Sequence, residues 1–183
     1  MNFFSKLATT AALAATLVTG ALPAEARSNP DHHIQLLEAP LAQGISVQVN
    51  PVECFEDGDF LGFYQGQRRL LVICQPGRVS QVGEVADFTE EDFDTFRHEV
   101  QHFIQDCMVG NDHDHVLGPV YQEPVDVALQ VLGRDYAAHI VGIYKENGAN
   151  DHVLILELEA FAVAALNDPL EQIQDIKNYC EGY

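Results

Sequence analysis

The sequence predicts one α+β domain, in which a small N-terminal antiparallel sheet is followed by about four helices. Two observations predict this class. Short stretches with alternating or continuous apolar residues, which is typical of strands, lie between residues 45 and 74. Longer stretches with apolar residues spaced three and four apart, which is typical of helices, lie between residues 89 and 179. Strands followed by a run of helices, without a repeat or linker, favour an α+β arrangement.

The first 26 residues have the pattern of a secretory signal peptide. A short start containing Lys6 precedes an apolar run over residues 7–22, and Ala24-Glu25-Ala26 then offers a cleavage site. The run is too short, and too rich in Ala and Thr, for a good membrane span. An uncleaved anchor is the alternative. We therefore expect residues 27–183 to form the mature domain, secreted or periplasmic and without a membrane span.

The N-terminal part of the mature chain is expected to hold three strands after a loose lead-in over residues 27–41, which contains two prolines. Residues 45–49 alternate between apolar and polar, as in a half-buried strand. Residues 60–64 and 69–74 are predicted to form a hairpin around residues 65–67. The second hairpin strand either pairs with an extended substrate or is a buried core strand.

Four helices are expected in the remainder of the chain. The first begins near Thr89, where Thr89 and Asp92 form a capping pattern, and runs to about residue 107. The others are predicted over residues 124–145, over residues 152–166, and from Asp168-Pro169 to residue 179, where an N-cap precedes a proline.

Four cysteines in an exported chain predict two disulfides. Three pairings are possible, and we favour Cys54–Cys74 within the strand region and Cys107–Cys180. The second would tie the end of the 89–107 helix to the last helix. A structural zinc site is the alternative use of cysteine, but no C-x-x-C spacing is present.

The chain is strongly acidic, with 9 basic and 28 acidic residues and a formal net charge of −19. Such a charge argues against nucleic acid or an anionic membrane as a partner. A solvated acidic surface is the simplest interpretation, and a preference for basic substrates or a salty environment also fits. The sequence contains no signal for the oligomeric state.

The predicted 89–107 helix carries His98-Glu99-Val100-Gln101-His102, which reads H-E-x-x-H. Residues i and i+4 of a helix lie on one face, so the two imidazoles can hold one zinc ion, with Glu99 beside them as a base. A helical wheel places the apolar stripe of this helix opposite both histidines. We therefore expect the stripe to face the core and the histidines to face a cleft. A surface helix with two solvated histidines is the alternative.

A zinc ion needs a third protein ligand, and the predicted 152–166 helix offers Glu157 and Glu159. A carboxylate within so apolar a helix is costly unless it is paired or bound to a metal. The two lie about 200° apart on the helical wheel, so we expect them to have different roles.

The H-E-V-Q-H motif, followed later by Glu157-Leu-Glu159-Ala-Phe-Ala, resembles the gluzincin clan of zinc metallopeptidases. The resemblance implies a zincin-like metallopeptidase domain and a zinc ion held by His98, His102 and Glu157. It also implies Glu99 as the general base that acts on a metal-bound water to hydrolyse a peptide or protein substrate. Glu159 is the alternative third ligand.

One departure from the family concerns the support of the ligands. Many members carry Asp four residues after the ligand Glu, where this chain has Phe161. Asp106, one turn after His102, could orient an imidazole instead. The departure bears more on catalysis than on metal binding. A catalytically inactive, zincin-like secreted protein that binds metal is therefore the second hypothesis, and a disulfide-linked domain without metal is the third.

Two further groups of residues have open roles. A polar run over residues 112–115 either binds a second metal or closes over the site, or it is a solvated loop. An oxyanion formed during hydrolysis needs a further donor. The sequence does not rank the candidates, which are Tyr121, Tyr136, His139 and Tyr144.

Overall fold

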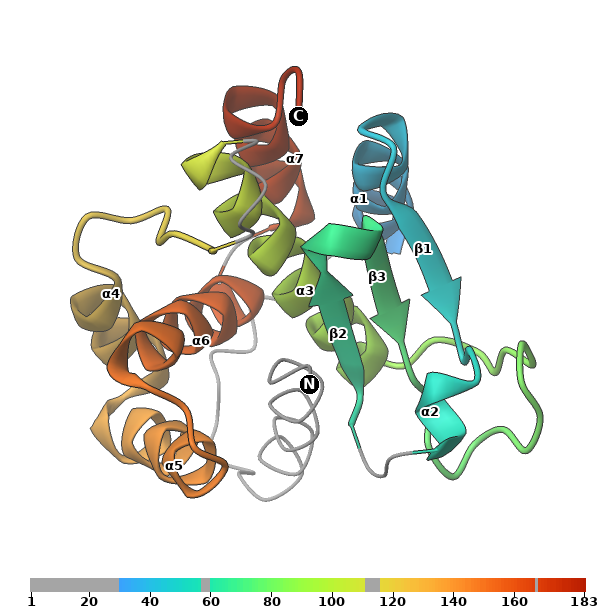
Figure 1. The fold of residues 1–183 in the computed structure, drawn as a ribbon, viewed down its shortest axis with the longest axis horizontal. Coiled ribbons are helices and arrows are strands. Elements are labelled where there is room, and N and C mark those ends of the chain that lie inside the picture. The colour runs from blue at the N-terminus through green and yellow to red at the C-terminus, as the bar shows by residue number, and fades with distance from the viewer. Residues whose placement is uncertain (1–29, 57–59, 111–115, 167) are drawn as a thin grey trace.

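The computed structural model describes residues 30–56, 60–110, 116–166 and 168–183. The predicted signal peptide and the polar run over residues 112–115 lie outside these ranges. Within them the fold is α+β, with one three-stranded sheet and seven α-helices (Figure 1). Helix α3 runs through the middle, with the sheet on one side and α4, α5 and α6 on the other (Figure 1).

The sheet is mixed, so the expectation of an antiparallel sheet is only half right. Its strands are β1 (Ser46–Val49), β2 (Gly62–Gln65) and β3 (Leu70–Ile73), in the order β1-β3-β2. β2 and β3 form the predicted antiparallel hairpin, whereas β1 pairs with β3 in parallel. All four residues of β3 are buried, which is typical of a central strand. Because both edges of β3 are paired, it is the buried core strand and does not offer an edge to a substrate.

Helix α1 (Pro30–Ala42) replaces the loose lead-in expected for residues 27–41. Pro30 occupies the first helical position, where the missing N–H is tolerated, and Pro40 lies near the end. The buried residues of α1 are His33, Leu36 and Pro40, a helical spacing that the prolines masked. The His33 ring stacks on Phe93, with ring centroids 4.2 Å apart.

Helix α3 (Glu90–Val109) confirms the first predicted helix and its cap. The Thr89 side chain accepts from the backbone N–H of Asp92, and the Asp92 side chain accepts from the backbone N–H of Thr89. From Phe96 to Cys107 every residue of α3 is buried. The apolar stripe contributes Phe96, Val100, Phe103 and Ile104 to the main core, as expected. The opposite face is not open, because α6 packs against it.

The remaining helices are α2 (Glu53–Glu56), α4 (Pro124–Leu132), α5 (Arg134–Glu146), α6 (Asp151–Leu166) and α7 (Pro169–Tyr179). The single helix predicted over residues 124–145 is divided into α4 and α5 at Gly133, whose φ of 78° and ψ of 159° are not helical. The α6 and α7 predictions are confirmed, including the Asp168 side chain that caps α7. Helices α4, α5 and α6 enclose a second core around Ile140, Tyr144 and Leu158.

Both predicted disulfides, Cys54–Cys74 and Cys107–Cys180, are present. Two disulfides are typical of a chain that folds in an oxidising compartment outside the cytoplasm. Among the described helices, none combines the length and the apolarity that a membrane crossing requires.

Candidate metal centre

Helices α3 and α6 bring His98, His102 and Glu157 together in the middle of the domain. His98 Nε2 lies 3.1 Å from His102 Nε2 and 3.2 Å from Glu157 Oε2. His102 Nε2 lies 3.5 Å from the same carboxylate oxygen. Two ring nitrogens and one oxygen therefore form a triangle of nearly equal sides.

The size of this triangle fits a small cation. Ligand atoms of a tetrahedral zinc ion, each about 2.1 Å from the metal, lie roughly 3.4 Å from one another. The three distances of 3.1, 3.2 and 3.5 Å bracket this value. Two imidazoles and one carboxylate also form the donor set of many catalytic zinc sites. Among the described residues, this is the only group of three such side chains that can hold a metal ion.

Burial and charge act together on these ligands. His98 and His102 are 6% and 8% exposed, and the Glu157 side chain is 14% exposed. Burial alone would lower the pKa of His102, but the Glu157 charge outweighs it and raises that pKa to about 9. Burial likewise raises the pKa of Glu157, but the two imidazoles hold it well below its usual range. These opposed shifts favour a protonated His102 beside an ionised Glu157.

Glu159, the alternative third ligand, lies away from the triangle and is completely buried. Its carboxylate accepts hydrogen bonds from the backbone N–H groups of Val120 and Tyr121, at 2.9 and 2.7 Å. It also accepts from Gln105 Nε2 at 2.7 Å. These donors satisfy the buried charge without a metal, so the two Glu residues of α6 have different partners.

The nitrogen of His102 that faces away from the triangle contacts Gln105, with Nδ1 2.8 Å from the amide Oε1. Asp106, the residue that the sequence suggested for orienting an imidazole, instead accepts from the hydroxyls of Tyr64 and Tyr183. The sequence reasoning missed Gln105, although its position one turn after His102 on the same helix was a signal that could have found it.

His98 has a different surrounding from His102. Its Nδ1 is buried and has no hydrogen-bond partner within the described residues. The Phe161 ring lies edge-on to the His98 ring, with centroids 4.5 Å apart. Phe161 of α6 therefore contacts His98 directly.

Glu99 is buried beside strand β2, with 6% of its surface exposed. Gly62 of β2 has no Cβ, and a Cβ there would lie 2.8 Å from Thr95 Cγ2 and 3.2 Å from Glu99 Cγ. This glycine therefore permits α3 to approach the strand. Burial raises the pKa of Glu99, while His98 and His102 oppose that rise. Glu99 does not belong to the ligand triangle.

The four oxyanion candidates are separated by the structure. Tyr144 of α5 is 2% exposed, and burial and the neighbouring Glu157 charge raise the pKa of its hydroxyl, so it lies beside a residue of the candidate metal centre. Tyr136 is half-buried, with its ring 6.5 Å from the Phe161 ring. His139 is exposed on α5, and Tyr121 contributes its backbone N–H to Glu159.

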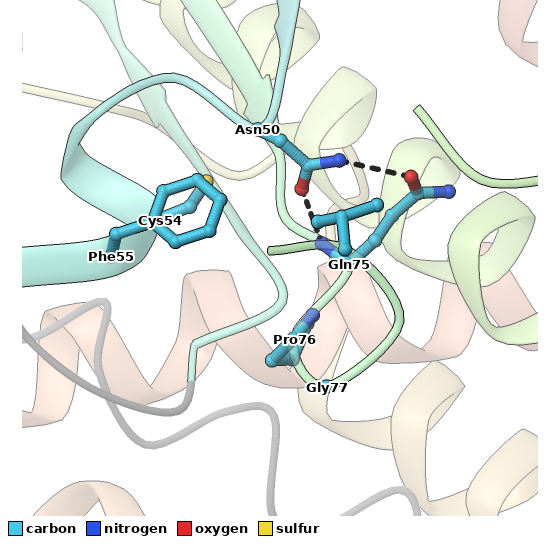
Figure 2. A pocket seen from close by; sticks show the side chains of 7 residues that line it. Asn50, Cys54, Phe55, Gln75, Pro76 and Gly77 are labelled. Atoms are coloured by element: carbon cyan, nitrogen blue, oxygen red, sulfur yellow. Dashed lines mark hydrogen bonds between the residues drawn. The ribbon is translucent and has the colours of Figure 1, made fainter. Parts of the chain in front are cut away.

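A cavity beside α2 lies apart from these residues (Figure 2). Its two polar side chains, Asn50 and Gln75, are hydrogen-bonded to each other at 3.0 Å. Neither has an unpartnered buried atom, and none of the lining residues belongs to the metal centre. The cavity therefore offers no chemistry comparable to that of the triangle.

No protein-family model, curated protein or solved structure matches this chain. Within the described residues, the buried group of His98, His102 and Glu157 can hold a metal ion.

Proposed function

We propose that this protein is an exported zinc-dependent peptidase with a zincin-like site. One observation supports the proposal most strongly: two histidines of an H-E-x-x-H helix and a carboxylate from a second helix converge within 3.5 Å. This spacing suits zinc, and the Glu of the motif lies next to the first ligand in the sequence. The two disulfides support folding outside the cytoplasm.

His98, His102 and Glu157 would hold the ion, which when bound supplies a Lewis acid that acidifies water and polarises a carbonyl group. Glu99 takes the proton from the attacking water and passes it to the leaving amine. Its raised pKa suits this double role, because a base nearer to neutrality also donates readily. Strand β2 lies beside Glu99 at the edge of the sheet, where an extended peptide can add as a further strand.

A metal-binding protein without turnover is the second candidate, and the surroundings of His98 favour it. Histidine ligands usually donate their other N–H to a carboxylate, a carbonyl or water. The Nδ1 of His98 has no such partner among the described residues, and Phe161 lies against the ring. A poorly oriented ligand can retain the metal while weakening catalysis.

Three forms of the purified protein test the proposal. Wild type and Glu99→Gln should each bind one zinc ion, whereas Glu157→Gln should bind it at least tenfold more weakly. Wild type should hydrolyse members of a diverse peptide library, and Glu99→Gln should lose that activity while it keeps the ion. If neither form cleaves any peptide and both bind zinc, the second candidate is correct. If wild type binds no stoichiometric zinc, both candidates fail.

A further inference from the structure

We propose that Gln105 and Glu159 are positioning residues that couple metal binding at His102 to docking of residues 116–123. In this arrangement a bound ion favours the docked segment, and the docked segment favours the ion. The inference rests on the metal site proposed above and assigns a regulatory role to residues 116–123, which precede α4.

The orientation of the Gln105 amide is fixed by its neighbours. Gln105 Nε2 lies 3.0 Å from the carbonyl oxygen of Leu156 and 2.7 Å from Glu159 Oε2. Both of these oxygens can only accept, since the Glu159 carboxylate itself receives two backbone N–H groups. The nitrogen of the amide must therefore point toward them, and its oxygen must face His102.

The Gln105 oxygen in turn selects the tautomer of His102. An amide oxygen accepts only, so His102 Nδ1, 2.8 Å away, must carry the proton. The neutral ring then has its lone pair on Nε2, which is the atom in the ligand triangle. Gln105 thus presents His102 to a metal in the binding-competent tautomer. Neither residue needs to move when the ion binds.

Glu159 connects this pair to the 116–123 segment. Its carboxylate is fully buried, and its hydrogen-bond donors include the backbone N–H groups of Val120 and Tyr121. The segment also donates from the N–H of Gly118 to the backbone oxygen of Gln105, at 3.0 Å. If the segment lifts away, a buried carboxylate loses two charge-assisted donors, which is costly. The side chain must then seek other partners, and the amide of Gln105 loses its strongest acceptor.

Coupling of this kind is reciprocal. If docking of the segment raises zinc affinity by some factor, zinc must favour the docked state by the same factor. Residues that orient a metal ligand typically change metal affinity about 10- to 100-fold when they are replaced. The same range is therefore expected for the effect of zinc on opening of the segment.

Hydrogen exchange and zinc affinity test this coupling in the full chain. Exchange of the Val120 and Tyr121 amides is compared with and without zinc, with the amide of Gly83 as a reference. Gly83 donates to Asn50 in a different loop. Zinc affinity is measured by chelator competition for wild type, Gln105→Met and Gln101→Met. Gln101 is a matched control, because it is buried on the same helix and approaches Glu159 at 3.5 Å but makes no described contact with His102.

We expect zinc to slow exchange at Val120 and Tyr121 at least tenfold more than at Gly83. Gln105→Met should bind zinc about 10- to 100-fold more weakly and lose this difference, whereas Gln101→Met should behave as wild type. If zinc binds wild type but exchange at the two amides follows Gly83, the coupling is wrong and the metal site stands. The same holds if the two variants bind zinc equally well. If wild type binds no zinc, both proposals fail. The wild-type comparison stays decisive if a variant does not fold.

Discussion

Zinc affinity should rise steeply with pH, because the ion and a proton compete for the same atom of His102. In the metal-free protein the Glu157 charge outweighs the effect of burial and raises the pKa of His102 to about 9. Below that pH one proton must leave for each ion that binds. The apparent association constant should therefore increase about tenfold per pH unit up to pH 9 and then level off.

The expected effect is large enough to measure clearly. From pH 6.5 to pH 8.5 the affinity should increase about 100-fold, or about 3 kcal/mol at 1.36 kcal/mol per pH unit. Stability of the metal-free protein should change in the opposite direction. The raised pKa of His102 stabilises the folded state fully below its ordinary value of 6.5, and this contribution disappears as the pH rises through about 9. The lowered pKa of Glu157 stabilises it above 4.5, and that contribution is lost on acidification.

Chelator competition at constant ionic strength, in steps of half a pH unit, measures the affinity. Urea unfolding of the metal-free protein over the same range measures the stability. Glu157→Gln is the control. Without the Glu157 charge, burial lowers the pKa of His102, so the zinc affinity of this variant should no longer increase with pH above neutral pH. A wild-type zinc affinity that is constant between pH 6.5 and 8.5 would refute the competition between proton and metal. It would also refute the assignment of His102 and Glu157 as ligands.

Three further predictions concern the framework of the site. Replacing Cys107 and Cys180 by Ser should lower the free energy of unfolding by about 4 kcal/mol in urea titrations, because that bridge closes a loop of 73 residues; a loss below 1 kcal/mol would contradict this entropic account. Thr89→Ala should cost about 1 kcal/mol in the same assay, because it removes the cap of α3, and no change would show that the cap is unimportant. Tyr144→Phe should weaken zinc binding about tenfold, because it removes a buried hydroxyl that interacts with Glu157, and unchanged affinity in chelator competition would rule out that role.

The helix that carries the site could be predicted from the sequence because its signals are local. The capping pair at Thr89 and Asp92 lies within one turn, and the two histidines need only the helical period to share a face. The two disulfides followed from even cysteine number and from the placement of predicted elements. Each of these predictions depends either on residues close together in the sequence or on the rule that cysteines of an exported chain pair as disulfides.

The secondary-structure predictions were wrong where contacts between residues far apart in the sequence decide the structure. The prolines of α1 suggested a loop, but they occupy a helix whose buried stripe rests on α3 and α7. The direction of β1 cannot be read from its own residues, because pairing with β3 in parallel depends on how the chain crosses between them. Gly133 divides a helical pattern that continues on both sides, and the two resulting helices, α4 and α5, both pack into the core around α6.

The choice between Glu157 and Glu159 as the third ligand also depends on contacts between distant parts of the chain. Helical periodicity placed them on different faces of α6 but could not say which face meets α3 at the histidines. The structure separates them by their partners. Gln105 was missed for a related reason: an amide beside a histidine acquires its role only when its other end is held by Leu156 and Glu159.

The two carboxylates of α6 also give the strongest physical argument for a cation. Both are buried in an apolar helix, and a buried charge must be compensated. Glu159 is compensated by backbone and amide donors, and it needs nothing more. Glu157 faces two imidazole nitrogens that can compensate it only by carrying a proton, at 3.2 and 3.5 Å. A proton on one of these nitrogens compensates the carboxylate in part, and at neutral pH a divalent ion would neutralise it more fully than a single proton does.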